Sequence, residues 1–362
     1  MINRVIHLLE VWRNDLRAVY ITEHGGTEAL TYGDLPEPEV GPNDVKVRVR
    51  ACALNRLDVY TRQGARGTRI RFKGPHVLGG DVAGDVVETG SEVSRVSAGE
   101  RVVVNPRITC IQCRYCLSGE EELCVRAGML GSTRSGGYAE YVSVPAVNVE
   151  PIPDSLSYAQ AASLPTVFLP CWTILVRKAQ LKAWETMLIP SASSGVGTAG
   201  IQVAKNVLGA KVITTTSTED KAQKARELGA DEVINYTTED IAQRVKEITD
   251  GQGVNVVLDH VGEDFYPAAI RSLATGGRYG ICGVTSGYRA DLQMGLMFLR
   301  YHTVFGVFMG RKEDLRQIVE LAGRGVIRGV IHETFALEDA AKAHEAMEAT
   351  NFFGKLVLTM EN

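Results

Sequence analysis

The chain has 362 residues, of which 45% are apolar and 23% charged, with a formal net charge of −4 and a pI of about 6.0. Such a composition is ordinary for a globular protein with two domains. The charge gives no electrostatic reason to expect nucleic acid or an anionic membrane as a partner. No apolar run approaches the ~20 residues needed to span a bilayer. We therefore expect a soluble, cytoplasmic protein with neither of these partners.

Residues 1–16 are predicted to be an N-terminal extension outside the first domain. Apolar residues from Ile2 to Trp12 recur at helical spacing, which is typical of an amphipathic helix. The segment lacks the long apolar stretch and the small-residue cleavage site of a secretory signal. Because Arg17 begins the first recognisable strand, an alternative is that the native chain starts at Leu16.

Two kinds of pattern divide the rest of the chain. From 17 to about 160 the sequence is rich in strands, and Val45–Arg50 alternates apolar and charged residues as a half-exposed antiparallel strand does. From about 169 to 308 short apolar runs alternate with helical stretches, which predicts βα units. After Gly310 two helices, at about 312–323 and 338–349, precede a last strand at 355–358. The fold class is therefore α/β, with a β-rich barrel or roll and a doubly wound parallel sheet.

Four of the seven cysteines lie close together in the sequence, and these are Cys110, Cys113, Cys116 and Cys124. Four thiolates at this spacing can wrap one tetrahedral Zn²⁺ and leave no coordination position open, so we predict one structural zinc. The residues between them are predicted to form turns rather than a helix or strand. A metal-free loop and a redox disulfide are the alternatives, and an intracellular context favours the metal.

A candidate dinucleotide-binding loop follows the apolar run Met187–Pro190. A strand, a turn of small residues and a helix N-terminus together bind a pyrophosphate through backbone N–H groups and the helix dipole. Two positions of the loop lack the glycine that the dinucleotide fingerprint prefers, so a tight turn without a ligand is the alternative. The predicted cofactor-binding residues of the loop are Ala192, Ser193, Ser194, Gly195, Val196 and Gly197.

The second strand of this unit ends in Thr216 and Ser217, where an NAD-binding protein usually carries an acid for the ribose 2′-hydroxyl. The next acids, Glu219 and Asp220, are followed by Lys221. Without an acid at the strand end, nothing repels a 2′-phosphate, and the hydroxyls and the lysine could bind it. NADP(H) is therefore favoured over NAD(H), although Lys221 could also be a solvated residue in the first turn of a helix.

Together these features resemble the medium-chain dehydrogenase/reductase superfamily, which contains the zinc alcohol dehydrogenases and the zeta-crystallin-like quinone reductases. The resemblance runs from Arg17 to the end of the chain. Besides the cysteines, it includes the loop Ser193–Gly197, the segment Glu227–Ala230 and the closing segment Phe353–Leu358.

The resemblance implies two domains with an active site between them. A GroES-like catalytic domain would comprise 17–167 and 309–362, and its four-cysteine zinc lobe would cover about 105–128. A Rossmann domain at 168–308 would be inserted within it.

Asn55, Gly80 and Thr166 match the positions at which zinc alcohol dehydrogenases of this family hold their catalytic metal. None of these residues belongs to that ligand set, so the resemblance implies no catalytic zinc. A site rebuilt from Cys52, His76 and Cys171 is an alternative with suitable ligand chemistry. However, Cys52 is an odd number of residues from Asn55 and so faces the other side of the strand, and Cys171 lies in an apolar segment typical of a core.

The stretch Asn55–Tyr60 resembles the Asn-x-x-Asp-x-Tyr stretch of metal-free quinone and enone reductases. The resemblance implies an NADPH-dependent reductase of quinones or α,β-unsaturated carbonyls, in which Asn55 orients the carbonyl or the nicotinamide amide and Tyr60 or water supplies the proton. Asn55 could instead only cap the strand end, and Tyr60 could be a packing aromatic. Asp81 is expected to pair with Lys355.

Lys221 and Tyr236 match positions that contact the NADP 2′-phosphate in bacterial quinone reductases, and Gly283 completes the predicted cofactor-binding residues.

The partner would be a small carbonyl, enone or quinone substrate. Because those quinone reductases generally lack the cysteine lobe, a zinc-independent alcohol or ketone dehydrogenase is an alternative. An NADP-binding structural or regulatory protein is an alternative of another class. Thr303–Phe308 is an apolar candidate edge strand, through which the family implies a homodimer or homotetramer.

Overall fold

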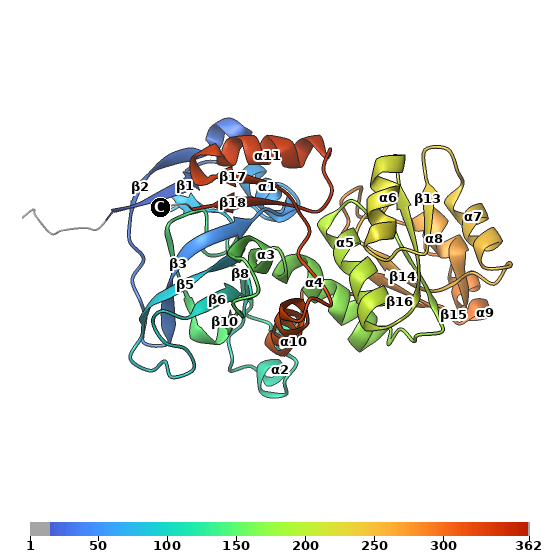
Figure 1. Ribbon diagram of the computed structural model, residues 1–362, viewed down its shortest axis with the longest axis horizontal. Helices are drawn as coiled ribbons and strands as arrows, with labels where there is room; N and C mark the ends of the chain where they lie inside the picture. The colour runs from blue at the N-terminus through green and yellow to red at the C-terminus, as the bar shows by residue number, and fades with distance from the viewer. Residues whose placement is uncertain (1–14, 361–362) are drawn as a thin grey trace, which may run out of the picture.

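The computed structural model describes residues 15–360, which form two domains lying side by side (Figure 1). Strands from the first and last parts of the chain belong to one domain, and the middle part forms the other. No helix within residues 15–360 is both long and apolar enough to cross a membrane. The architecture is the predicted α/β combination of a β-rich domain and a doubly wound sheet.

The β-rich domain contains a mixed sheet in the order β10-β6-β5-β3-β18-β17, and β9 also pairs with β3. These strands are β3 (Asp44–Ala53), β5 (Asp81–Thr89), β6 (Arg101–Val104), β9 (Tyr141–Pro145), β10 (Val149–Pro151), β17 (Ile331–Ala336) and β18 (Lys355–Thr359). A smaller sheet has the order β2-β1-β4, from β1 (Asp15–Ile21), β2 (Thr31–Pro36) and β4 (His76–Val77). The alternation predicted over Val45–Arg50 is confirmed, because β3 is antiparallel to β5 and β9 and buries every second side chain.

Strand β18 places the end of the chain inside this first sheet, between β3 and β17. Val357 pairs with Ala53 and Leu358 with Cys52, so the last strand is antiparallel to β3 (Figure 1). The two predicted helices before it are α10 (Lys312–Gly323) and α11 (Ala340–Ala349). This return of the chain brings Lys355 beside Asn55, which lies 300 residues earlier.

The second domain is a parallel sheet in the order β13-β12-β11-β14-β15-β16. Numbered along the chain this is the order 3-2-1-4-5-6 of a Rossmann fold. Its strands are β11 (Thr186–Ile189), β12 (Lys211–Thr216), β13 (Glu232–Asn235), β14 (Val254–Asp259), β15 (Leu273–Ile281) and β16 (Thr303–Gly306). Its helices are α5 (Gly195–Gln202), α6 (Glu219–Glu227), α7 (Ile241–Ile248), α8 (Tyr266–Ser272) and α9 (Met294–Arg300). Strands β12 and β14 are buried almost throughout, as strands covered on both faces should be.

Helix α4 (Pro165–Trp172) lies between the two domains, and the predicted domain boundary after residue 167 falls inside it (Figure 1). Phe168 and Leu169 are 1% and 0% exposed and belong to one apolar cluster that contains residues of both domains. Burying each of these side chains contributes about 1.5–3 kcal/mol. The domains therefore share part of their core, and helix α3 (Tyr158–Ala162) adjoins α4 on the side of the β-rich domain.

Two predictions about local structure are wrong. Leu16 is 3% exposed and pairs with Leu35 in a strand that begins at Asp15, so the residues from Asp15 onward belong to the first domain and not to an extension. The other residues of that prediction, 1–14, lie outside the described part of the chain. The cysteine segment contains a helical turn, α2 (Arg114–Leu117), because one such turn brings Cys113 and Cys116 to the same side.

Candidate active site

The predicted dinucleotide loop joins β11 to α5 in the Rossmann domain. Ser194 caps α5, and its Oγ accepts from the N–H of Gly197 at 2.8 Å. A Cβ atom on Gly197 would lie 2.2 Å from the carbonyl oxygen of Ser191, so only glycine fits there. A Cβ atom on Gly195 would lie 2.8 Å from the side chain of Val167 and 2.9 Å from that of Lys355. The loop is thus held tightly against both the helix and the first domain.

The backbone N–H groups of Ser193, Gly195 and Val196 have no acceptor among residues 15–360. They precede or begin a helix, where the partial positive charge of the helix N-terminus also lies. Three free donors at this point of a Rossmann fold fit a pyrophosphate. The residues present therefore suit a dinucleotide.

The residues predicted to bind the ribose end gather at the carboxyl ends of β12 and β13. The N–H of Tyr236 donates to the carbonyl oxygen of Thr216 at 3.1 Å, and Thr218 caps α6 in front of Lys221. The hydroxyl of Thr216 is buried without a partner among the described residues. An orphaned donor of this kind requires an acceptor from a ligand or water.

The two acids that begin α6 are engaged elsewhere. Glu219 pairs with Arg226 at 2.7 Å and Asp220 pairs with Lys224 at 2.8 Å. Lys221 takes part in none of the ion pairs formed by the described residues. Each of the two acids that follow Ser217 and Thr218 therefore has a cationic partner on α6. Gly283 follows β15, and a Cβ atom there would lie 2.8 Å from the carbonyl oxygen of His260.

Asn55, Asp81, Thr166 and Lys355 form a polar group at the domain junction, which we call the Asp81 cluster; Asp81 and Lys355 are buried, and Asn55 and Thr166 are half-buried. Asn55 Nδ2 donates to Asp81 Oδ2 at 2.9 Å, and Lys355 Nζ donates to Asn55 Oδ1 at 2.6 Å. Thr166 donates to Asp81 Oδ1 through its backbone N–H (3.1 Å) and its hydroxyl (2.6 Å). The expected pair of Asp81 with Lys355 is confirmed at 3.3 Å, with side chains 0% and 4% exposed.

The Asp81 cluster includes two of the three positions that match catalytic zinc ligands. Gly80 is the third, and a Cβ atom there would lie 2.9 Å from the carbonyl oxygen of Leu130 and 3.3 Å from Pro106. The backbone of this turn therefore leaves no room for a ligating side chain at Gly80. The ammonium of Lys355 supplies the positive charge of the cluster.

The alternative zinc ligands do not come together. Cys52 is fully buried against Gly79 and Tyr138, and His76 contacts the carbonyl oxygen of Gly131. Cys171 is 0% exposed, and its Sγ lies 3.6 Å from the carbonyl oxygen of Val196, which confirms its expected place in the core. Within residues 15–360, the cysteine lobe is the one group of metal-ligating side chains close enough to hold an ion.

Asn55 is the N-cap of helix α1 (Arg56–Gln63), and both groups of its side-chain amide already have partners in the Asp81 cluster. One lone pair of its Oδ1 remains for a further donor. Its backbone N–H donates to Asp58 Oδ2 at 2.8 Å, and burial raises the pKa of Asp58 to about 7. A group that titrates near neutral pH therefore lies directly behind Asn55.

A buried chain of polar residues behind Asp58 was not anticipated. The hydroxyl of Tyr138 lies 3.4 Å from Asp58 Oδ2 and 3.2 Å from His344 Nε2, and Arg62 contacts His344 Nδ1 at 3.2 Å. Burial lowers the pKa of His344 to about 3, so its ring is neutral and Nδ1 accepts from Arg62, which can only donate. Nε2–H then donates to Tyr138, and Tyr138 donates to Asp58. These residues come from distant segments, and no local signal in the sequence joins them.

The cysteine lobe brings its four Sγ atoms within 4.8 Å of one another. The separations are 3.9 Å for Cys110–Cys116, 3.6 Å for Cys113–Cys116 and 3.5 Å for Cys110–Cys124. A Zn²⁺ ion bound at ~2.3 Å per bond would place its four sulfur ligands about 3.8 Å apart. A hydrogen bond from the backbone of Gln112 is the main cause that lowers the pKa of Cys110, to about 5. The donor set therefore fits one tetrahedral zinc.

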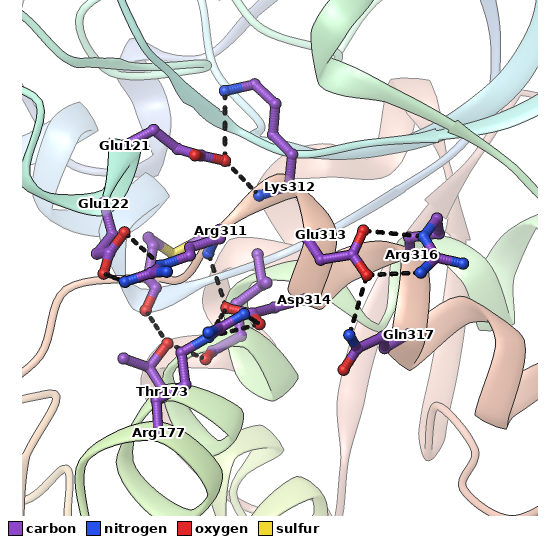
Figure 2. Close-up of polar contacts among 12 residues, drawn as sticks. Glu121, Glu122, Thr173, Arg177, Arg311, Lys312, Glu313, Asp314, Arg316 and Gln317 are labelled. Carbon is purple, nitrogen blue, oxygen red and sulfur yellow. Dashed lines mark hydrogen bonds and ion pairs between the residues drawn. The ribbon is translucent and has the colours of Figure 1, made fainter. Parts of the chain in front are cut away.

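The lobe contacts the point where the chain returns from the Rossmann domain (Figure 2). Glu122 accepts two bonds from Arg311, at 2.8 and 2.7 Å, and Glu121 accepts from the backbone N–H of Lys312 at 2.9 Å. Glu121 and Glu122 belong to the short turn η2 (Glu121–Leu123), directly before Cys124. On the other side Asp314, which is fully buried, accepts from Arg177 at 2.7 Å. The lobe thus secures the start of α10 between itself and the helical segment that follows α4.

The fold, the loop after β11 and the polar junction define a two-domain oxidoreductase with a nicotinamide cofactor. Residues 41–154 match the family model of the alcohol dehydrogenase GroES-like domain, and residues 195–324 match that of zinc-binding dehydrogenases. A solved structure, described as an NAD-dependent alcohol dehydrogenase, superposes with a TM-score of 0.91 at 40% identity and covers 95% of this chain and 100% of its own.

Relatives that match this chain along nearly their full length are named for three different activities. An NAD-dependent alcohol dehydrogenase of Saccharolobus solfataricus is 34% identical over 95% of this chain and 99% of its own. An acryloyl-coenzyme A reductase of Metallosphaera sedula is 30% identical over 95% and 100%, and a quinone oxidoreductase of Pseudomonas aeruginosa is 32% identical over 94% and 99%. The chain belongs to the medium-chain dehydrogenase/reductase superfamily, and the resemblance read from the sequence is confirmed.

Proposed function

We propose that the protein is an NADPH-dependent reductase of quinones or α,β-unsaturated carbonyls that works without a catalytic metal and keeps one structural zinc in its cysteine lobe. The observation that carries this proposal is the Asp81 cluster. It occupies two of the matching ligand positions with a hydrogen-bonded amide and hydroxyl, and Gly80 has no room for a third ligand. We therefore infer a reaction that needs no Lewis acid.

A metal stabilises the alkoxide of a simple carbonyl by several kcal/mol, and without it the substrate must need less stabilisation or hydrogen bonds must supply it. Hydride added to a conjugated carbon leaves a delocalised anion, which needs less. When bound, the nicotinamide cofactor would supply the hydride. Asn55, oriented by Asp81 and Lys355, would accept a hydrogen bond from the nicotinamide amide through the remaining lone pair of its Oδ1, and the substrate carbonyl would lie beside the nicotinamide. Tyr60 or water would return one proton to the anion, and the saturated carbonyl or hydroquinone would leave.

The substrate class is tested by comparing methyl vinyl ketone with ethyl methyl ketone as acceptors, which differ only in conjugation. We expect kcat/KM with NADPH to favour the enone at least about 100-fold, because the saturated ketone needs the charge stabilisation that the site lacks. In the same assay Tyr60→Phe is expected to lower kcat for the enone if the phenol is the proton donor and to leave it unchanged if water is. Comparable rates with both ketones would favour the dehydrogenase alternative, which the names of the alcohol dehydrogenase relatives support.

Cofactor preference is proposed to depend on Lys221. Replacing Lys221 with alanine should lower the ratio of kcat/KM for NADPH over NADH about tenfold, because one charge-assisted bond to the 2′-phosphate is lost. Lys224→Ala is the matched control, since Lys224 lies one turn further along α6 and is paired with Asp220. A ratio that changes equally in both variants, or in neither, would contradict the assignment.

We further propose that the protein is a homo-oligomer assembled at the edge of the Rossmann sheet. Within the described chain β16 pairs on one side only, with β15. The neighbouring helix α9 exposes Met294 (74%), Phe298 (71%) and Leu299 (69%). An unpaired strand beside apolar side chains is a surface that a second copy can cover. Light scattering of the purified protein gives the number of copies.

A further inference from the structure

Arg66 bridges the two domains next to the proposed substrate site. Its guanidinium donates to the backbone carbonyl oxygens of Val284 (2.7 Å) and Thr285 (2.9 Å), which follow β15 in the Rossmann domain. The rings of Tyr60 and Tyr288, one from each domain, lie 4.9 and 5.3 Å from its central carbon. Arg66 therefore lies within contact distance of the proposed proton donor and of the loop that begins at Gly283.

The charge of Arg66 has no anionic partner. Its contacts are two neutral carbonyl groups and two aromatic faces, and among residues 15–360 it forms no ion pair. Two of the five N–H donors of a guanidinium are used, so three remain for a ligand. Arg66 also has a φ of 52°, in the left-handed region that residues other than glycine rarely adopt. The loop thus presents an exposed, uncompensated cation at some cost in backbone energy.

Three more exposed cations follow at positions 69, 71 and 73, and together with Arg66 we call them the basic row: Arg66, Arg69, Arg71 and Lys73. Ile70 and Phe72, which alternate with the last three cations, are half-buried and face the protein. The backbone N–H of Ile70 donates to His24 Nε2 at 3.0 Å, and the ring of Phe72 packs edge-on against the ring of His24 at 4.8 Å. Because Ile70 and Phe72 pack inward while Arg69, Arg71 and Lys73 are exposed, these three cations lie on the solvent side of the segment.

The basic row is a local exception in a chain of net charge −4. From 61 to 80 the sequence contains no Asp or Glu, and no member of the row forms an ion pair within the described part of the chain. Like charges at this spacing repel one another and do not stabilise the fold. A small quinone or enal carries no charge that the row could attract. The row instead fits a substrate with several negative charges at a distance from its reacting carbons.

We infer that the basic row binds the phosphate groups of a coenzyme A thioester and that the preferred acceptor is an enoyl-coenzyme A. This inference rests on the proposed function and narrows its substrate class. Arg66 receives the part of the ligand that leaves the junction, while Arg69, Arg71 and Lys73 bind phosphates further along the loop. The reacting double bond and thioester carbonyl lie at the Asp81 cluster, as for any conjugated acceptor.

The test compares crotonyl-coenzyme A with the crotonyl thioester of N-acetylcysteamine, which has the same reacting group and no phosphate. Replacing Arg69, Arg71 and Lys73 with glutamine is expected to lower kcat/KM for the coenzyme A thioester about 10- to 100-fold through KM, the sum of three exposed ion pairs. For the N-acetylcysteamine thioester and for NADPH, KM should stay within about twofold. Added salt should weaken the wild-type reaction with the coenzyme A thioester and not that of the variant.

The matched control replaces three exposed lysines elsewhere on the surface, Lys178, Lys182 and Lys246, with glutamine. It should leave kcat/KM for both thioesters unchanged. Equal losses on both thioesters, or no loss on crotonyl-coenzyme A, would overturn the inference. If the wild-type enzyme reduces methyl vinyl ketone but does not prefer the coenzyme A thioester to its phosphate-free counterpart, the inference fails and the proposed function stands. If it reduces no conjugated acceptor, the proposed function itself fails.

Discussion

Replacing Asp81 with leucine is expected to lower the free energy of unfolding by about 3–5 kcal/mol, because the variant leaves a buried charge without its partner. The side chain of Lys355 is only 4% exposed. Apart from Asp81, its ammonium contacts the neutral side-chain oxygen of Asn55. Thr166 also loses the acceptor for its hydroxyl and for its backbone N–H at the start of α4. Chemical denaturation of the wild type and the variant measures the loss.

The double variant Asp81→Leu with Lys355→Met is expected to recover part of this stability, since it removes the unpaired charge but leaves Thr166 without its acceptor. It should not recover kcat, because Asn55 then has neither of the partners that orient its amide. Glu88→Gln is the control on the same strand. Glu88 forms an ion pair with Lys46, but its side chain is 52% exposed, so this pair contributes at most about 1 kcal/mol. A loss below that size in Asp81→Leu would mean that Lys355 reaches water.

Removing the zinc from the cysteine lobe is expected to loosen the start of α10 as well as the lobe itself. Replacing Cys113 and Cys116 with serine should reduce the zinc content from one ion per chain to none and lower the apparent stability by several kcal/mol, because metal binding and local folding are coupled. Since Glu121 and Glu122 then lose their fixed positions, Arg311 and Lys312 lose their partners. Hydrogen exchange of the amides at 309–316 should become faster.

Two further variants, at residues labelled in Figure 2, separate the loss of zinc from the loosening of α10. Glu122→Gln weakens the pair with Arg311 without touching a cysteine, so it should keep the zinc and still raise exchange at 309–316. Glu313→Gln breaks the exposed pair with Arg316 on the same helix and should change neither quantity. Unchanged exchange after zinc loss would show that the lobe and α10 are independent. Two zinc ions per wild-type chain would contradict the metal-free mechanism.

Features that depend on short spacing could be predicted from the sequence. The four cysteines lie within one segment, so their thiolates had to be close, and the strand, turn and helix around Ser194 are adjacent in the chain. The alternating strand at Val45–Arg50 and the two helices before the last strand follow from periodicity. The helical turn α2 was missed because four residues are too few to show a period.

By itself, then, the sequence determined the class of fold, the cysteine lobe, the strand–turn–helix unit around Ser194 and the family, because each rests on neighbouring residues or on an ordered set of local motifs. Only the tertiary structure decided what surrounds Asn55. Lys355 is 300 residues from Asn55 along the chain, and it arrives because β18 inserts beside β3. The same applies to His344 behind Asp58 and to Val284 beside Arg66. Contacts between distant segments are set by how sheets and domains pack, and no local pattern records them.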